Sequence, residues 1–160
     1  MSWTTADICD EHGDAVRVLE PRFHHLGATD RFCGPAATVL ALEDNSLVRE
    51  ALGEAGEGRI LVVDGGGSLR CALVGDRLAT LAVANGWTGI VVWGAVRDTA
   101  VLKTLDIGVA ALATHPRRSV KRDTGERGVP VRIAGVTIAP GDWLYADGDG
   151  IVVTGKRVHP

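Results

Sequence analysis

Residues 75–98 decide the fold of this chain: Gly75-Asp76-Arg77-Leu78, an apolar-periodic run, Asn85-Gly86, Thr88 to Gly94, and Arg97-Asp98. The interior of this stretch predicts a helix, a tight turn and a buried strand, so the chain should return to a point near its start. Twenty residues separate Asp76 from Arg97. We therefore expect Asp76, Arg97 and Asp98 to meet at one edge of a sheet. Two carboxylates and a guanidinium in one pocket suit a divalent metal and an anionic substrate.

The length of 160 residues predicts one domain that spans residues 1–160. Hydrophobic residues make up 46% of the chain, and only 4% are aromatic, so the core should consist mainly of Val, Leu, Ile and Ala. The net charge of −3 predicts no direct contact with nucleic acid. No stretch reaches the roughly 18 consecutive apolar residues of a membrane helix. The first residues lack the pattern of a signal peptide, so we expect a cytoplasmic protein with free cysteines.

The pattern on both sides of residues 75–98 predicts alternating strands and helices, which is typical of the α/β class. The run at 47–52 has helical spacing, and the run at 59–63 is almost wholly apolar, as expected of a central strand. The expected elements are a strand over 36–42, a helix over 47–52, strands over 59–63, 90–93 and 108–113, a helix over 76–85, and a helix that Arg97-Asp98 opens, with Val101, Leu102 and Leu105 on its apolar face.

The two ends of the chain differ from this central region. Residues 4–12 predict a short helix and residues 16–19 a strand, whereas residues 23–35 read as irregular. The C-terminal third predicts a β-rich layer of short strands joined by Gly, Pro and Asp turns, over 129–133, 136–138, 143–146 and 151–153.

Three further motifs were weighed as sites and given structural interpretations. The pair His24-His25 favours an extended segment, because adjacent side chains on a strand point opposite ways and cannot easily bind one ion. The glycines of residues 64–68 fail the dinucleotide-binding pattern because Arg70 stands where a third glycine is required, so we expect a close-packed turn beside the site. The basic cluster at 117–122 is expected to be a solvated loop.

The residues of the central stretch can bind an anion and a cation. Free amides at the start of the helix can receive a carboxylate, and Arg97 can grip an anion with two parallel N–H groups. Asp98, with several waters, can hold Mg²⁺ or Mn²⁺. The alternative is that Asp98 only caps a helix and Arg97 pairs with a surface acid, and spacing alone favours this alternative.

The chain resembles the RraA family (regulators of ribonuclease E activity), which includes the metal-dependent 4-hydroxy-4-methyl-2-oxoglutarate aldolases. The likeness covers nearly the whole sequence. It rests on residues 5–10, 32–36, 43–45, 61–70, 72–76, 86–89, 94–98, 106–108 and 145–147, which recur in the same order at similar spacing. The resemblance implies a layered α/β/β sandwich of the swivelling-domain type with a β-rich C-terminal third.

The resemblance also assigns roles. Aldolase-type members carry an Asp, twenty residues and then Arg-Asp, whereas the regulator best known for inhibiting ribonuclease E lacks both acids. Asp76, Arg97 and Asp98 fit the aldolase pattern. It implies that Arg97 also binds substrate, that Asp98 takes the Mg²⁺ or Mn²⁺ ion, and that Asp76 helps to move a proton. The substrate's keto-acid end would be held by the loop Gly75, Asp76, Arg77 and Leu78.

The implied reaction is release of pyruvate from 4-hydroxy-4-methyl-2-oxoglutarate-type acids by an aldolase, or from oxaloacetate by a decarboxylase. A Schiff-base route is disfavoured because the three lysines stand outside the central motif. Longer members borrow an acid from a neighbouring subunit's extension, and this sequence ends at Pro160, so the second proton-transfer group stays open. The resemblance implies a homotrimer with sites at subunit interfaces. The competing hypothesis is a non-catalytic regulator that binds a ribonuclease E-type enzyme through its surface.

Overall fold

The long strand β3 (Phe32–Leu40) joins the two halves of the fold in the computed structural model, which describes residues 2–159. Residues 32–35 of β3 pair antiparallel with β11 (Trp143–Asp147), and residues 36–40 pair parallel with β4 (Ile60–Asp64). One ten-stranded sheet results, in the order β1-β12-β11-β3-β4-β6-β7-β2. Two short strands attach beside this path, β5 on β6 and β8 on β3.

The central strands β3, β4, β6 and β7 run parallel, and residues 60–63 of β4 are fully buried because both faces of this region are covered. A separate two-stranded sheet pairs β9 with β10. The remaining strands are β1 (Arg17–Val18), β2 (His24–His25), β5 (Ala72–Val74), β6 (Gly89–Val96), β7 (Gly108–Thr114), β8 (Glu126–Arg127), β9 (Val131–Ile133), β10 (Val136–Ile138) and β12 (Gly150–Thr154).

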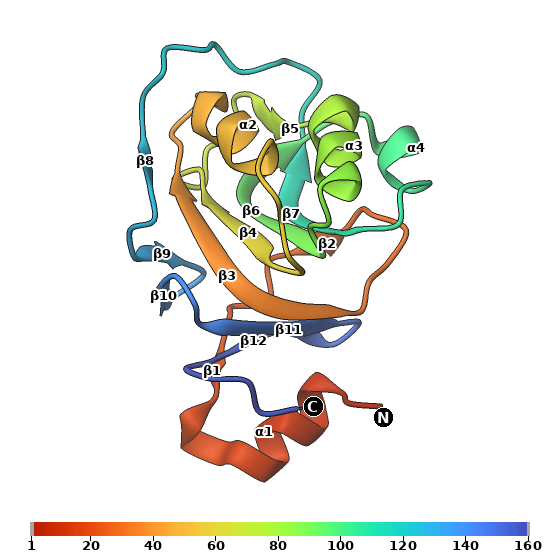
Figure 1. Cartoon of the computed structure of the whole chain (residues 1–160), viewed down its shortest axis with the longest axis vertical. Coiled ribbons are helices and arrows are strands. Elements are labelled where there is room, and N and C mark those ends of the chain that lie inside the picture. The colour runs from red at the N-terminus through yellow and green to blue at the C-terminus, as the bar shows by residue number, and fades with distance from the viewer. Residues whose placement is uncertain (1, 160) are drawn as a thin grey trace.

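Three helices cover one face of the parallel strands, and the C-terminal strands lie toward the other (Figure 1). These helices are α2 (Ser46–Leu52), α3 (Asp76–Ala84) and α4 (Thr99–Leu102). One hydrophobic cluster fills the space between helices and strands, and a second lies between the parallel strands and β9 to β12. This layering confirms the expected α/β/β arrangement and its β-rich C-terminal third. Among the described residues, no helix has the length and apolar character needed to cross a membrane.

The N-terminal helix α1 (Thr5–His12) and the 3₁₀ turn that follows it (Gly13–Ala15) lie at the end of the molecule opposite the other helices (Figure 1). Thr4 caps α1 through a hydrogen bond from the amide of Asp7, as the sequence predicted. The carboxylate of Asp147 accepts hydrogen bonds from the amide and hydroxyl of Thr5, both at 2.7 Å. This buried contact ties the start of α1 to the β11–β12 hairpin.

Several boundaries differ from the sequence-based expectations. Strand β3 begins at Phe32 rather than at residue 36, and β2 lies in the stretch that was expected to be irregular. Gly34 and Pro35 gave that stretch its irregular pattern, because both are uncommon inside strands. Helix α4 begins at Thr99, and Val101 is 41% exposed instead of facing the core. Strand β8 was not expected at all, since two residues carry too little periodicity to be recognised.

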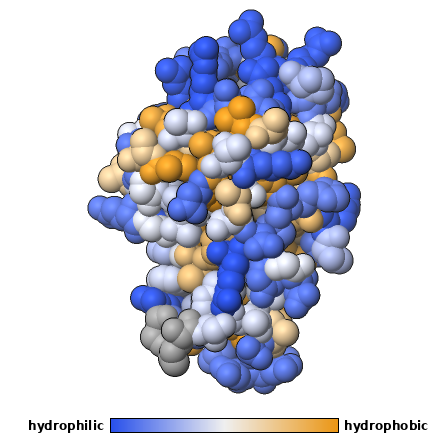
Figure 2. All heavy atoms as spheres, turned by 90° about the vertical axis from the view of Figure 1, so that its right-hand side faces the viewer, coloured by the Kyte–Doolittle hydropathy of each residue, from blue (hydrophilic) through white to orange (hydrophobic). Residues whose placement is uncertain are grey.

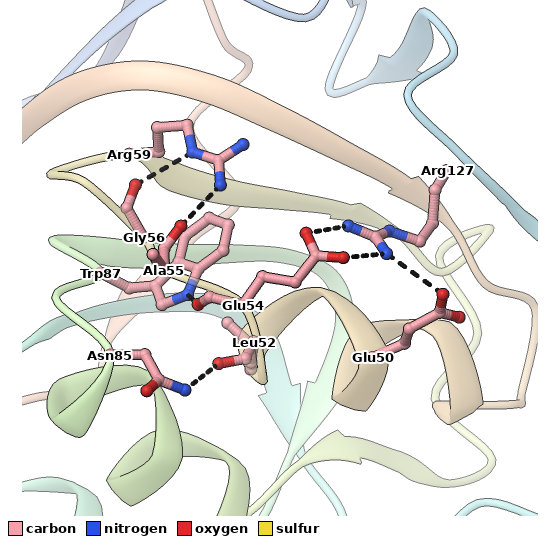
Figure 3. A network of polar contacts seen from close by, with 9 residues as sticks. All are labelled: Glu50, Leu52, Glu54, Ala55, Gly56, Arg59, Asn85, Trp87 and Arg127. Atoms are coloured by element: carbon pink, nitrogen blue, oxygen red, sulfur yellow. Dashed lines mark hydrogen bonds and ion pairs between the residues drawn. The ribbon is translucent and has the colours of Figure 1, made fainter.

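Polar contacts hold the C-terminal ends of α2 and α3 together (Figure 3). Arg127 on β8 donates two hydrogen bonds to the carboxylate of Glu54, at 2.9 and 2.7 Å. The indole N–H of Trp87 donates to the carbonyl of Glu54, and the amide of Asn85 donates to the carbonyl of Leu52 at 2.8 Å. Because both helices are fixed at these ends, their opposite ends keep a constant separation.

Candidate active site

The candidate site lies where two neighbouring parallel strands end. Strand β5 pairs with β6 through Ala72 opposite Ala95 and Val74 opposite Val96. The amide of Arg97 donates to the carbonyl of Val74 at 2.9 Å, so the segments that follow the two strands begin side by side. Helix, turn and strand between residues 76 and 96 thus return the chain to its starting edge, and the expected meeting of the two acids and the guanidinium is confirmed.

Asp98 has a left-handed backbone, with φ of 61° and ψ of 42°. Such a conformation is costly for a residue with a Cβ atom, and in native proteins it is commonly associated with function. Its Oδ2 atom accepts a hydrogen bond at 3.0 Å from the amide of Asp76, at the first turn of α3. The side chain makes no capping bond to α4, the helix that follows it. Asp98 therefore docks onto the start of a different helix, which the capping alternative did not foresee.

Gly75 makes this docking possible. A Cβ atom at Gly75 would lie 2.6 Å from Oδ2 of Asp98, and 3.3 Å from the Cγ atom of Arg97. Real Cβ atoms essentially never approach another atom as closely as 2.6 Å. The glycine is therefore required here by close approach to a functional carboxylate, because its own φ of −133° is open to any residue.

Arg97 and Asp76 present the other two side chains of the motif. The Nε atom of Arg97 lies 3.9 Å from Oδ2 of Asp98, and its Nη1 atom donates to the carbonyl of Pro116 at 3.4 Å. Its side chain is 38% exposed, so part of the guanidinium faces solvent. One carboxylate oxygen of Asp76 accepts from the amide of Arg77 at 2.8 Å. Arg97 is thus fixed beside Asp98 rather than paired with a remote surface acid.

These residues line a cavity of about 730 Å³. All of the residues predicted from the sequence, Gly75 to Leu78 together with Arg97 and Asp98, belong to its wall. The wall also contains residues that sequence reasoning missed: Asn45, Arg49, Ala72, Leu73, Val74, Leu81, Arg118 and Lys121. Its five cationic side chains outnumber its two carboxylates, so the cavity favours an anion with more than one negative charge.

The loop over residues 115–124 supplies two of these cations, and its expected role as a solvated loop was wrong. The carbonyl of Arg117 accepts a hydrogen bond at 2.7 Å from the amide of Ala72 on β5. Ser119 is only 4% exposed, and its hydroxyl accepts from the amide of Asn45 at 3.2 Å. The loop passes over α2 and α3 in Figure 1, at an end of the molecule where hydrophilic side chains gather (Figure 2).

The glycine turn at residues 65–67 was expected beside the site, and it lies elsewhere. The amides of Gly65 and Gly67 both donate to the carbonyl of Trp93 at 3.1 Å, and neither glycine lines the cavity. A Cβ atom on Gly65 would lie 2.8 Å from that carbonyl oxygen. The turn lets the chain leave β4 and enter β5 while it stays against β6, so the expected close packing is correct and its expected position is not.

A divalent metal would have a single protein ligand here. Across residues 2–159, no group of three or more His, Cys, Asp or Glu side chains is placed to hold a metal. The Oδ2 atom of Asp98 is occupied by the amide of Asp76, and within the described chain no protein donor contacts Oδ1. One carboxylate oxygen on an open cavity suits Mg²⁺, which keeps several waters and takes further oxygens from its substrate. The donor set therefore fits Mg²⁺ or Mn²⁺ and is too sparse for a dedicated protein cage.

The fold and the site together describe a layered α/β/β protein with a cation-rich cavity at the ends of two parallel strands. Residues 5–153 match the model of the RraA-like family, described as Aldolase/RraA. The chain belongs to the RraA-like family.

Sequence relatives agree with this assignment. A protein from Alkalilimnicola ehrlichii is 61% identical over 153 residues, which cover 96% of this chain and 95% of the relative. A protein from Laribacter hongkongensis is 56% identical over 154 residues, which cover 96% of this chain and 97% of the relative. Both carry the provisional name 4-hydroxy-4-methyl-2-oxoglutarate aldolase.

Two solved structures share the fold almost completely. A Geobacillus kaustophilus protein described as an S-adenosylmethionine:2-dimethylmenaquinone methyltransferase has a TM-score of 0.96 and 46% identity, covering 98% of this chain and 97% of its own. The RNA-processing inhibitor RraA from Thermus thermophilis also has a TM-score of 0.96, with 43% identity, covering 99% of this chain and 96% of its own. One fold thus carries several names, and the choice between functions depends on the site.

Proposed function

We propose that this chain is a divalent-metal-dependent carbon–carbon lyase that releases pyruvate from 4-hydroxy-4-methyl-2-oxoglutarate-type 2-oxo acids and from oxaloacetate. The observation that carries the proposal is the cavity in which Gly75, Arg97 and Asp98 come together at the start of α3. The provisional aldolase names of relatives that are 61% and 56% identical support the same reaction class. The excess of cationic side chains suits substrates with two carboxylates.

The residues at the start of α3 bind the keto-acid end of the substrate. The first amides of a helix have no acceptor within the helix, and the helix dipole adds a partial positive charge, so a carboxylate is stabilised there. In this proposal Gly75, Asp76, Arg77 and Leu78 form the receiving loop. The guanidinium of Arg97 faces the keto oxygen and gives it two directed N–H groups.

A divalent ion held by Asp98 would supply Lewis-acid polarisation of the substrate's keto group. The electron pair of the breaking carbon–carbon bond passes into the pyruvyl fragment, so negative charge develops at its keto oxygen. Arg97 stabilises that charge, and it is already fixed by its contact with the carbonyl of Pro116. Asp76 has one carboxylate oxygen bound to the amide of Arg77, which leaves the other free to hold or move a proton at the reacting carbon or at a water.

Lys121 lines the cavity, so a Schiff-base route must be compared with this one. A lysine becomes a nucleophile at neutral pH when it is desolvated or placed beside another cation. Lys121 is exposed on the loop, and no acid or base of the motif contacts it in the described chain. The metal-dependent route is therefore favoured.

Pyruvate release from oxaloacetate provides the test. We expect turnover with Mg²⁺ that is lost on addition of a chelator and restored by excess Mg²⁺ or Mn²⁺. Asp98→Asn should abolish the metal-dependent rate while the fold is retained. Asp106→Asn, which changes an exposed acid outside the cavity wall, is the matched control and should keep wild-type turnover. Full activity in the presence of chelator would contradict the proposal.

A second function is favoured by the structural neighbours. The relative from Thermus thermophilis is described as an RNA-processing inhibitor. A Streptomyces coelicolor protein with a TM-score of 0.77 and 29% identity is described as a member of the RNase ES inhibitor family. A non-catalytic regulator would bind a ribonuclease E-type enzyme through its surface, and the Asp98→Asn variant would then inhibit that enzyme as well as the wild-type chain does.

We also propose that the protein acts in the cytoplasm as a homotrimer with its cavities at subunit interfaces. The proposal extends the family resemblance, and the open cavity of the single chain is consistent with a wall completed by a neighbour. Light scattering in solution tests the trimer. A monomer with full turnover would contradict it.

A further inference from the structure

Asp44 is a buried carboxylate with an unusual number of hydrogen-bond donors. It stands between β3 and α2 and is 1% exposed. Its Oδ1 atom accepts from the amide and the hydroxyl of Ser46, at 2.9 and 2.6 Å. Its Oδ2 atom accepts from the amide of Arg122 at 2.8 Å, from the amide of Thr124 at 3.1 Å and from the Thr124 hydroxyl at 2.9 Å. A charge at this depth is tolerated only because it is so fully hydrogen-bonded.

The two oxygens of Asp44 serve different parts of the structure. Oδ1 fixes the start of α2, the helix that contributes Arg49 to the cavity wall. Oδ2 fixes the end of the 115–124 loop, whose residues Arg118 and Lys121 stand on the same wall. A single carboxylate therefore sets the separation between the loop and the helix that faces it.

The rest of the loop has little else to hold it. It contains no helix or strand, and most of its side chains are exposed. Apart from Asp44, its contacts to the body are the bond from the amide of Ala72 to the Arg117 carbonyl, the bond from the amide of Asn45 to the Ser119 hydroxyl, and the bond from the Asp123 amide to the Ser46 hydroxyl. Loss of the Oδ2 bonds would free the segment that carries the two cations.

We propose that Asp44 is a positioning residue, which holds Arg118 and Lys121 over the cavity so that they bind the substrate carboxylate remote from the keto group. This inference rests on the proposed lyase function. The start of α3 and Arg97 already receive the keto-acid end, and 730 Å³ leaves room for a larger molecule than pyruvate. The loop cations face that remaining space. Asp44 touches no substrate atom and acts only through the loop.

Two kinetic constants separate positioning from a general structural role. Asp44→Asn should raise the KM of oxaloacetate, a dicarboxylate, by about tenfold, because charge-assisted hydrogen bonds are lost. The kcat and the inhibition constant of pyruvate, which has no second carboxylate, should stay within about twofold. Thr124→Val, which removes one donor to Oδ2 and leaves Oδ1 with Ser46, should raise KM by about threefold. Thr124→Ser keeps the hydroxyl and should behave as the wild type.

A combined variant tests whether Asp44 works through the loop cations. Replacing Arg118 and Lys121 by Ala should raise the KM of oxaloacetate by itself, and adding Asp44→Asn should then change it by less than about twofold. Effects that multiply, or an equal loss of pyruvate affinity in Asp44→Asn, would overturn the inference. So would a kcat that falls while KM stays constant.

Amide hydrogen exchange keeps this inference separate from the proposed function. The amides of Arg122 and Thr124 donate to Asp44, so their exchange should accelerate about tenfold or more in Asp44→Asn, whether or not the protein turns over oxaloacetate. Unchanged exchange at both amides would overturn the positioning role directly. Absence of metal-dependent turnover in the wild-type chain, with faster exchange in the variant, would instead overturn the lyase function.

Discussion

Replacement of Gly75 by Ala tests the geometry of the site with one methyl group. The new Cβ atom would lie 2.6 Å from Oδ2 of Asp98, against an ordinary contact limit of 3.4 Å. The carboxylate must therefore move by about 0.8 Å, since Asp98 is held by a left-handed backbone and the methyl group is fixed to the chain. Such a movement lengthens the 3.0 Å hydrogen bond from the amide of Asp76 and carries the proposed metal ligand with it.

The expected loss is large in activity and small in stability. A misplacement of about 1 Å costs about a hundredfold in rate. Alanine is also a poorer N-cap than glycine, so α3 should lose up to about 1 kcal/mol. We therefore expect kcat for pyruvate release to fall about a hundredfold in Gly75→Ala, with a melting temperature lowered by only a few degrees. The dissociation constant of Mn²⁺, measured by electron paramagnetic resonance, should rise in the same variant.

Gly148→Ala is the matched control, because a Cβ atom at Gly148 has no atom within 4 Å and this residue lies outside the cavity. It should keep wild-type kcat and Mn²⁺ affinity. Gly75→Ala with unchanged kcat and Mn²⁺ affinity would refute the reasoning, since Asp98 would then have no need of its observed position. Equal losses in both alanine variants would show that the effect does not come from Asp98.

Three further predictions concern catalysis, stability and pH. Arg97→Lys should lower kcat about a hundredfold, because an ammonium group cannot give the keto oxygen two directed N–H groups; steady-state pyruvate release measures this, and a loss below fivefold would contradict it. Tyr145→Phe should lower the free energy of unfolding by about 1 kcal/mol in urea titrations with unchanged activity, because the buried hydroxyl accepts the amides of Val158 and His159 at 2.9 and 3.2 Å. Burial raises the pKa of Asp44, but hydrogen bonds from Ser46, Thr124 and Arg122 outweigh it and hold the pKa below its ordinary value. Since a lowered folded-state pKa stabilises the protein above the unfolded-state value of about 3.9, this contribution is lost as the pH falls below that value. Acid titration of unfolding should therefore be flatter in Asp44→Asn, and identical profiles would contradict the prediction.

The central strands and the meeting of the motif residues could be predicted because they depend on local periodicity. The apolar runs at 60–63 and 90–93 read as buried strands, and the helix between Asp76 and Asn85 has clear spacing and a glycine stop at Gly86. Parallel strands joined by a helix bring their carboxyl ends to one edge, so the position of Asp98 near Asp76 followed from the connection alone.

The rest of the cavity wall depends on contacts that no local pattern records. Arg118 and Lys121 reach it because Asp44, far earlier in the chain, accepts the amides of Arg122 and Thr124. The same cluster read as solvated because charges in a Gly- and Pro-flanked segment usually face water. The docking of Asp98 on α3 was also hidden, since its left-handed backbone is set by tertiary contacts.

The divided pairing of β3 has a consequence for the order in which the chain can assemble during synthesis. Its second half finds β4 soon after it leaves the ribosome, because that partner follows closely in the sequence. Its first half must wait for β11, which is translated near the end. The segments that form the cavity wall are all translated before β11. The nascent protein can therefore contain a nearly complete pocket on a sheet that still has an unpaired stretch, and this stretch is where aggregation would begin if translation stopped early.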